Sequence, residues 1–273
     1  MAKPPASQAS GPDSSGARSA TGGRLPSGAL PVPQTWRERA YARVKDVERR
    51  VRRGFGNDLS TPRGRFAAWA HFHLLDHAFL RVPWTNFAPV ATGVYRSNHP
   101  GPARLRRWAS QGIRGVLNLR GDDGQAPWLL EADACRKLGL DLRVAKIYAR
   151  KPATRREIVR LLDTMREMPK PFVMHCKSGA DRAGLAAVLY AHCIDGQPLA
   201  DARKHLSWRY LHLSSTKTGA VDHILDMYET RAAEGPISLE DWIRTEYMAR
   251  DAVISFAKKR GHPIPAKYRD PPD

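Results

Sequence analysis

A short apolar segment at 171–176, PFVMHC, is followed after six residues by a largely apolar segment at 183–195, AGLAAVLYAHCID. The first has the length and composition of a buried strand, and the second has those of a helix that has to be buried. Between them, HCKSGADR places several chemically active side chains in one turn. A strand that leads into a buried helix through a tight loop is typical of α/β architecture.

The rest of the chain alternates in the same way. We expect strands at 90–97 (a short pair), 113–120 and 140–148, and helices at 103–112, 127–139, 154–168, 198–207, 217–233 and 238–259. In the segment 154–168, apolar residues recur three and four positions apart, which indicates one buried helix face. The alternation predicts an α/β fold, a three-layer α/β/α domain with a mostly parallel central sheet and extra N-terminal helices.

Composition divides the chain into four parts. Residues 1–34 are rich in Ala, Pro, Ser and Gly, which predicts a disordered tail. Residues 35–87 form a basic extension that we expect to be helical. The α/β domain is expected at 88–235, and a C-terminal helix and tail at 236–273.

The basic extension contains two expected helices. The first begins at Thr35 as an N-cap and ends at Gly54. It is mostly cationic, so it is either a solvated helix or a peripheral contact for anionic lipid or another acidic surface. The second, at 63–81, places His73 and His77 four residues apart, where they could bind a metal ion. Structural histidines fit this pattern better, and we expect no metal site.

The formal net charge of +18 predicts a basic surface that attracts acidic partners without naming one. The basic helix has few interleaved aromatic residues and no recognisable reader motif, so we expect no specific nucleic-acid ligand. The 3 cysteines have no CxxC spacing. They therefore indicate neither a disulfide framework nor a zinc site, and they fit a reducing, cytoplasmic setting. We expect no secretory signal and no transmembrane segment.

The chemistry is concentrated in the turn between the buried strand and its helix. Backbone amides and a helix N-terminus can surround one anion at the carboxyl edge of an α/β sheet. Gly179 permits the positive φ that such a loop needs, and Arg182 supplies a planar cationic fork for two phosphate oxygens. These groups favour the thiolate form of Cys176, a nucleophile for phosphorus. His175 is expected to orient the loop through hydrogen bonds.

This turn has the pattern His-Cys-(X)5-Arg, and it resembles the signature of the cysteine-based protein tyrosine phosphatase superfamily. The matching positions are His175, Cys176, Gly179 and Arg182. The match is similar to the bacterial dual-specificity and tyrosine-phosphatase-like branch that carries HCKSGxDRxG. The segment 93–124 also looks like the opening part of compact dual-specificity phosphatases. The resemblance covers about 88–230 and makes 88–235 the expected phosphatase domain.

The resemblance implies a two-step reaction that needs no cofactor and no metal. Cys176 attacks phosphorus and forms a cysteinyl-phosphate, a general acid protonates the leaving oxygen, and water then hydrolyses the intermediate. Arg182 and the loop amides stabilise the equatorial oxygens throughout. The expected substrate-binding residues are His175, Lys177, Ser178, Gly179 and Ala180.

Two positions depart from the family pattern. Ala183 stands where the family usually has Ser or Thr, whose hydroxyl helps the cysteine to leave. This difference predicts slow breakdown of the phosphoenzyme, or help from another group such as Ser178. The loop 148–154, YARKPAT, lacks the aspartate that usually serves as the general acid.

Three other aspartates are candidates for the general acid. Asp181 lies inside the loop, where relatives such as the myotubularins also carry an aspartate. The alternative is that Asp181 only braces Arg182 through an ion pair. Asp122 and Asp123 belong to GDDG, which could equally be only a turn.

Three functions remain open at this point. The leading one is hydrolysis of phosphotyrosine, with phosphoserine or phosphothreonine as further substrates in phosphoproteins. The second keeps the chemistry but acts on a phosphoinositide or another phosphorylated metabolite, which Lys177 and the positive charge favour. The third is a phosphate-binding pseudo-enzyme or adaptor, which Ala183 and the missing loop acid favour. Intact nucleophile and arginine positions weigh against the third.

Overall fold

The computed structural model describes residues 35–36, 39–43, 46 and 55–268. The chain divides into two compact units, 1–47 and 48–273. In the smaller unit the described residues 39–43 are helical, as the sequence predicted, and the tail predicted at 1–34 lies outside the described residues. None of the helices in the described ranges is long and apolar enough to cross a membrane.

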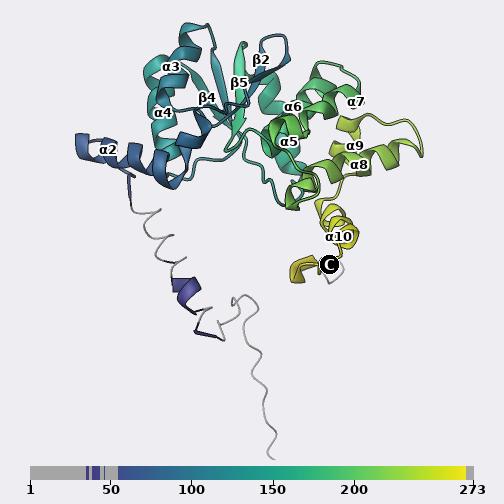
Figure 1. Cartoon of the computed structure of the whole chain (residues 1–273). Helices are drawn as coiled ribbons and strands as arrows, with labels where there is room; N and C mark the ends of the chain where they lie inside the picture. The colour runs from purple at the N-terminus through teal and green to yellow at the C-terminus, as the bar shows by residue number, and fades with distance from the viewer. Residues whose placement is uncertain (1–34, 37–38, 44–45, 47–54, 269–273) are drawn as a thin grey trace, which may run out of the picture. The chain divides into compact units, whose positions relative to one another are not determined.

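A five-stranded sheet forms the centre of the larger unit (Figure 1), in the order β1-β2-β5-β3-β4. Only the edge strand β1 is antiparallel to its neighbour, and the other three pairings are parallel. The strands are β1 (Ala88–Ala91), β2 (Val94–Asn98), β3 (Gly115–Asn118), β4 (Asp141–Val144) and β5 (Phe172–Cys176). The mostly parallel sheet predicted from the sequence is therefore confirmed.

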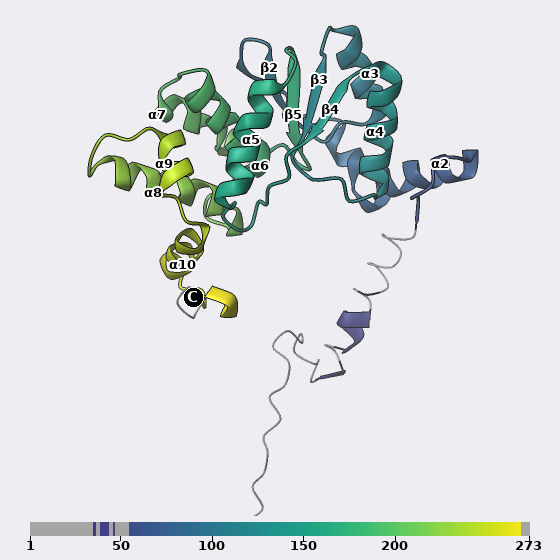
Figure 2. The same cartoon turned by 180° about the vertical axis from the view of Figure 1, so that it is seen from behind.

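Helices cover both faces of the sheet, as Figures 1 and 2 show from opposite sides. One face carries α3 (Pro102–Ser110) and α4 (Ala126–Leu138). The other carries α5 (Arg155–Glu167), α6 (Asp181–Leu189), α7 (Leu199–Ala202), α8 (Ala220–Ala232) and α9 (Leu239–Thr245). Outside these layers lie α2 (Pro62–Ala70) and α10 (Ala249–Lys259). This arrangement confirms the three-layer α/β/α fold.

The strand β5 shows why helices are needed on both faces. Its side chains alternate between the faces, so Val173 joins the apolar cluster under α3 and α4, while Phe172 and Met174 join the larger cluster on the other face. All five residues of β5 are buried. A central strand with two buried faces reads as a continuous apolar run, which is how PFVMHC appears in the sequence.

Helix α5 illustrates how local sequence and packing agree. Thr154 accepts a hydrogen bond from the backbone of Glu157, and the Glu157 side chain accepts one from the backbone of Thr154, which forms a capping box. The buried residues of this helix are Ile158, Leu161, Leu162 and Met165. The predicted helix at 154–168 is therefore confirmed to within one residue at each end.

The predicted helix at 63–81 is wrong beyond its first part. It continues from α2 as a π-helical turn (His71–Leu75) and then breaks, because His77 adopts a left-handed conformation with φ of 57° before a 3-10 turn (Ala78–Arg81). The break turns the Asp76 carboxylate towards Arg81, at 2.7 Å. Since the helix ends before His77, the two histidines at 73 and 77 do not share a helix face.

The predicted helix at 238–259 is two helices. Met248 has an extended conformation between α9 and α10. The carbonyl groups of Thr245 and Tyr247, which a continuous helix would use internally, instead accept hydrogen bonds from the Arg155 side chain at 3.0 Å each. The Tyr247 hydroxyl in turn donates to the backbone oxygen of Ala153 at 2.7 Å. Tertiary hydrogen bonds thus replace the helical ones at the break.

Replacing Ile158 by alanine should measure the packing of α5 on the sheet. Ile158 is fully buried, at 0% exposure, and its loss should lower the free energy of unfolding by about 2–5 kcal/mol. The exposed Arg156 on the same helix is the matched control, and Arg156→Ala should change stability by less than about 0.5 kcal/mol. Urea unfolding followed by circular dichroism measures both; equal losses would contradict the packing described.

Candidate active site

The cysteine loop lies at the carboxyl end of the central strand. Strand β5 ends at Cys176, and α6 begins at Asp181 after a four-residue loop. Because β5 pairs with β2 and β3 in parallel, the loop is flanked by the ends of both neighbours, with Asn98 opposite Cys176. This is the edge of an open α/β sheet where ligands bind. The structure therefore places the predicted loop where the sequence placed it.

The loop holds its carbonyl oxygens away from its centre. The oxygen of Lys177 accepts from the backbone of His99 at 3.2 Å, and that of Ser178 accepts from the Asn86 side chain at 2.8 Å. The oxygens of Gly179 and Ala180 both accept from Arg96. In a trans peptide the N–H points opposite to the C=O. The amides are thereby directed inwards, as in an anion-binding nest.

Arg96 is the cation that joins the loop to the rest of the domain. Its side chain is fully buried, and besides the two loop carbonyls it donates to the backbone oxygen of His205 at 2.5 Å. Its guanidinium lies 3.9 Å from the ring centre of Tyr210. Burial lowers the pKa of Arg96 to about 10, so the group stays charged at neutral pH. The sequence analysis did not single out Arg96, although it lies in the segment 93–124.

Gly179 has the left-handed backbone conformation expected of it, with φ of +75°. A Cβ atom at this position would lie 2.7 Å from the Asn98 backbone nitrogen and 2.7 Å from the Asn86 Cβ. The loop therefore needs glycine for two independent reasons, its dihedral angle and the close approach of two neighbouring segments.

A cavity of about 870 Å³ opens over the loop. Lys177, Ser178, Asp181 and Arg182 of the loop line it, together with residues of three other segments: Asp76, His77, Leu80, Arg81, Tyr148, Ala149, Arg150, Lys151 and Thr218. The loop at 148–151, which lacks a carboxylate, thus supplies Arg150 and Lys151. With five Lys or Arg residues against two aspartates, the cavity is suited to an anionic ligand.

Arg182 keeps a free donor at this cavity. Its Nη1 lies 3.5 Å from the backbone oxygen of Leu119, a long contact. Among the described residues, its Nε is buried and has no hydrogen-bond partner. A buried guanidinium N–H without an acceptor is costly, which favours an anion as its missing partner. Cys176 is itself only 1% exposed, beneath the loop.

Asp76 is a cavity residue that the sequence analysis did not identify as part of the site. Its carboxylate lies 2.7 Å from Arg81, 3.0 Å from Arg120 and 3.1 Å from Lys177. Burial opposes ionisation of Asp76, but Arg120, Arg81 and Lys177 outweigh it and hold the pKa well below its usual range. Asp76 therefore carries no proton near neutral pH, and its contact with Lys177 joins the segment before β1 to the loop.

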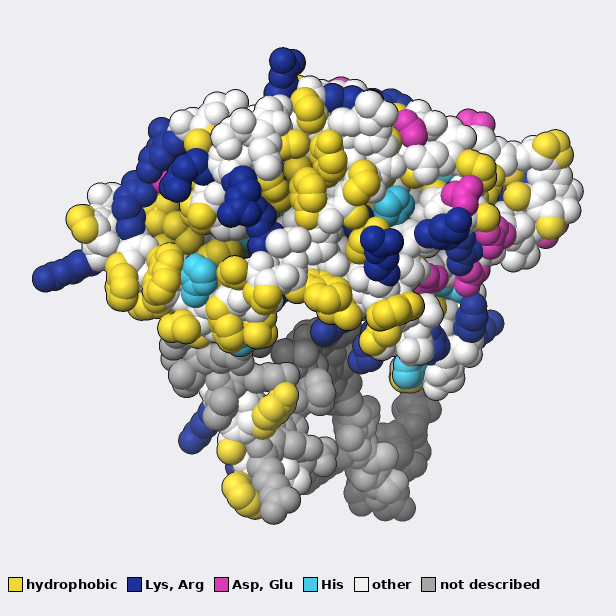
Figure 3. Space-filling model, turned by 45° about the horizontal axis from the view of Figure 1, so that its top comes forward, with side chains coloured by type: hydrophobic (Ala, Val, Ile, Leu, Met, Phe, Trp, Pro, Cys, Tyr) yellow, Lys and Arg dark blue, Asp and Glu magenta, His cyan; other side chains and the backbone are white. Residues whose placement is uncertain are grey.

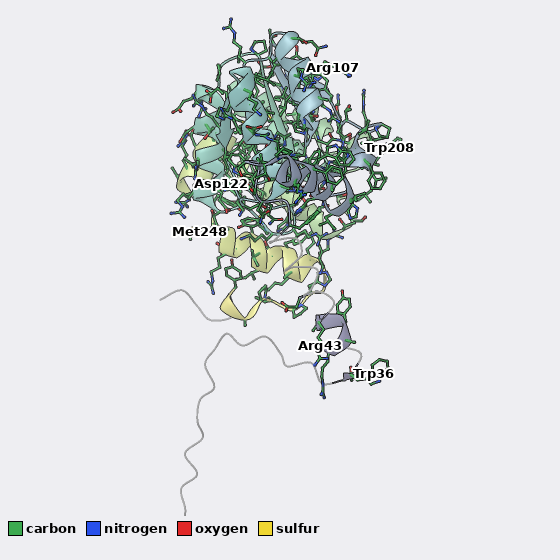
Figure 4. All side chains as sticks on the ribbon, turned by 90° about the vertical axis from the view of Figure 1, so that its left-hand side faces the viewer. Trp36, Arg43, Arg107, Asp122, Trp208 and Met248 are labelled. Carbon is green, nitrogen blue, oxygen red and sulfur yellow. The ribbon has the colours of Figure 1, made fainter. Side chains whose placement is uncertain are left out.

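The three aspartates proposed as general acids lie in different surroundings. Asp122 and Asp123 are exposed and are not among the residues that line the cavity; Figure 4 shows Asp122 on the surface of the domain. Asp181 lines the cavity. Its carboxylate lies 2.7 Å from His212, whereas the sequence analysis had considered an ion pair with Arg182. His212 carried no sequence signal, because it is separated from the loop by thirty residues without a recognisable motif.

Behind the loop lies a buried group of two histidines and a glutamate. The potential ligand atoms of His99, Glu131 and His175 lie within 4.8 Å of one another. However, His175 Nε2 is 2.5 Å from Glu131 Oε1, which is too short a separation for two ligands of one metal ion. Asn118 also donates to Glu131, at 2.5 Å. We therefore interpret this group as the support that fixes His175 at the end of β5.

Replacing Gly179 by alanine should disrupt anion binding at the loop. The strain of about 1–3 kcal/mol expected from the dihedral angle and the contacts with Asn86 and Asn98 should weaken binding of tungstate about tenfold or more. Gly124 is the control, since its φ is +69° but its Cβ would meet nothing within 4 Å. Calorimetric titration should show unchanged affinity for Gly124→Ala; unchanged affinity for both would contradict the loop geometry.

The chain is similar to several known proteins over its central part. Residues 87–198 match the tyrosine phosphatase family, and no curated protein matches the chain. Similar solved structures include TpbA of P. aeruginosa, with 20% identity over 55% of this chain and 91% of that one and a TM-score of 0.44. Tk-PTP in its active form has 21% identity, coverages of 54% and 99%, and a TM-score of 0.42. The catalytic core of the PP-IP phosphatase Siw14 of S. cerevisiae has 14% identity, coverages of 55% and 91%, and a TM-score of 0.43. The segment that carries the cysteine loop is therefore similar to the tyrosine phosphatase family.

Proposed function

We propose that the protein hydrolyses phosphate monoesters through a cysteinyl-phosphate on Cys176. The observation that carries the proposal is the loop after β5, in which four successive carbonyl groups are bonded outwards over a buried cysteine. Beside this loop, the Nε of Arg182 has no hydrogen-bond partner among the described residues and is available to the same ligand. A tetrahedral oxyanion is the ligand that such a set of donors recognises.

The reaction follows from these groups. The Cys176 thiolate attacks phosphorus in line with the leaving oxygen, and the loop amides and Arg182 bind the equatorial oxygens. Ser178 and Lys177 lie on the cavity side of the loop, while Gly179 and Ala180 contribute backbone. His175 positions the sulfur through its contact with Glu131. Water then hydrolyses the phosphoenzyme.

We assign the general acid to Asp181. It lines the cavity, whereas Asp122 and Asp123 do not, and Asp76 is held ionised by its three cations. A general acid has to reach the leaving oxygen, and Asp181 lies beside the arginine that would bind the same phosphoryl group.

Ala183 affects the second step. It is fully buried in α6 and provides no hydroxyl to assist the departing thiolate. The hydroxyl of Ser178, which accepts from the Ala180 amide at 3.3 Å, is the group of the loop available for that task. Slow hydrolysis of the phosphoenzyme is therefore expected. If hydrolysis did not occur at all, the protein would be an adaptor that binds phosphate without turnover.

The substrate class divides into two candidates. Phosphotyrosine, with phosphoserine or phosphothreonine, is the one that the loop signature suggests. The second is a small molecule with several phosphates, such as a phosphorylated inositol, and it is favoured by the cations that surround the loop. Lys177, Arg150 and Lys151 line the cavity beyond the group that would bind the first phosphate. Further phosphates of one ligand could pair with them.

Contact with an acidic surface through the basic N-terminal helix stays a proposal. That helix lies mostly outside the described residues. On the larger unit, Figure 3 shows a face on which hydrophobic side chains lie among those of Lys and Arg. Leu80, which is 61% exposed, lines the cavity.

Cys176→Ser should abolish hydrolysis of an aryl phosphate, with a loss of at least about a thousandfold in kcat. Cys193→Ser is the control, because Cys193 is a free, half-buried cysteine packed against the core. Release of the phenol measures both variants. Turnover that survives in Cys176→Ser would refute the nucleophile, and a single burst in the wild type without later turnover would favour the adaptor.

Removing the two cations of the 148–151 loop should separate the substrate candidates. If the substrate has several phosphates, Arg150→Met combined with Lys151→Met should lower kcat/KM for inositol polyphosphates about tenfold or more, and that for a phosphotyrosine peptide much less. The control is Arg156→Met, which removes an exposed cation outside the cavity. Equal losses on both substrates would argue against a second phosphate site.

A further inference from the structure

His212 connects the active-site cavity with a second cavity. Its Nδ1 lies 2.7 Å from Asp181 Oδ1 and its Nε2 lies 2.7 Å from Asp222 Oδ2, while the residue itself is 3% exposed. Asp181 begins α6 and lines the active-site cavity. Asp222 lies in the first turn of α8 and lines a separate cavity of about 420 Å³. The three side chains form a continuous row from one cavity to the other.

The two carboxylates in this row favour the protonated form of the His212 imidazole. Burial disfavours the charged imidazole of His212, but the hydrogen bonds to Asp181 and Asp222 outweigh it and raise its pKa to about 9. A carboxylic acid in an ordinary environment has a pKa of about 4 and is ionised at neutral pH. An aspartate bonded to a protonated histidine therefore has a proton within reach for the leaving group.

We propose that His212 is a positioning residue and proton reservoir behind Asp181, held in place and kept charged by Asp222. The inference rests on the proposed phosphatase function, and it adds two residues to the site that the family signature does not contain. Asp181 remains the group that contacts the substrate. His212 and Asp222 act through it.

The proton is conserved through the two steps. His212 Nδ1 gives its proton to the Asp181 carboxylate. As the S–P bond forms and the bond from phosphorus to the leaving oxygen breaks, Asp181 passes that proton to the leaving oxygen and is again a carboxylate. His212 becomes a neutral imidazole that still donates from Nε2 to Asp222. When water attacks the phosphoenzyme, its proton passes through Asp181 to Nδ1 as the S–P bond breaks. The cycle ends with inorganic phosphate, a thiolate and a protonated His212.

Other charges surround this row without bonding to the imidazole. Arg182 follows Asp181 in α6, and the charge of Arg96 in β2 also acts on Asp181. On the far side, the second cavity brings further groups towards Asp222: Arg203, His223, Asp226, Lys259 and Arg260. Asp226 is engaged by Arg203 at 2.7 Å and Lys259 at 3.0 Å. The bonds to the two carboxylates are thus the ones that set the charge of His212.

The test is Asp222→Asn, which keeps an acceptor for Nε2 but removes the charge, at a residue outside the active-site cavity. With phenyl phosphate, whose leaving group needs a proton, kcat/KM should fall about tenfold or more. With 2,4-dinitrophenyl phosphate, whose leaving group departs as an anion, it should fall less than about twofold. Because His212 has to be protonated, the alkaline fall in activity should also move to lower pH in this variant.

Two controls make the result specific. Asp226→Asn removes a carboxylate one helical turn further along α8 that bonds to Arg203 and Lys259, and His77→Gln removes an exposed histidine of the active-site cavity. Neither should change the ratio of the two substrates. An unchanged ratio in Asp222→Asn, or a changed ratio in His77→Gln, would overturn the relay.

A second measurement does not depend on turnover. Titration of the His212 imidazole by NMR should give a midpoint near 9 in the wild type and a lower one in Asp222→Asn. An ordinary midpoint near 6.5 in the wild type would refute the relay even in an active enzyme. Loss of all aryl phosphate hydrolysis in Cys176→Ser reports separately on the nucleophile, so the two proposals can fail independently.

Discussion

The buried guanidinium of Arg96 is the interaction on which the site depends. A loop of four residues with its amides turned inwards has to place its carbonyl oxygens in the protein interior, where each needs a donor. Arg96 supplies donors to two successive carbonyls, and Asn86 and the His99 backbone supply the others. Without them, the loop could not present its amides to an anion without leaving its own acceptors unpaired. The conformation of the anion-binding loop therefore depends on donors that lie outside the loop.

Ion pairs determine which charged groups of the cavity remain available to a ligand. Asp76 neutralises part of the field by binding Arg81, Arg120 and Lys177, and these contacts connect the segment before β1 to the loop after β5. Asp181 is engaged by His212 rather than by the arginine beside it. Arg182 is therefore left with a donor for a ligand. The cations paired with Asp76 join separate segments of the fold. The unpaired Nε of Arg182 marks the proposed binding position of an anion.

The sequence predicted secondary-structure elements correctly where the local pattern of apolar residues matches the burial of the element in the tertiary structure. The apolar run at 171–176 and the spaced apolar residues of 154–168 gave a strand and a helix in their observed places, because burial on two faces or on one face leaves a distinct period. The helices predicted at 63–81 and 238–259 failed for one reason. Their interruptions, at His77 and Met248, serve side chains and carbonyl groups that bond to distant parts of the chain.

The site shows the same division. The sequence by itself predicted Cys176, Gly179 and Arg182 as residues of the proposed site, since their chemistry depends on spacing within one turn of the chain. It left three aspartates as candidates for the acid, and it contained no sign of Asp76, His212 or Asp222. Only the tertiary structure decided that Asp181 faces the cavity, that Arg96 holds the loop and that His212 lies between two helix N-termini. The physical reason is that hydrogen bonds between residues far apart in the chain form only after the layers have packed, so no local pattern records them.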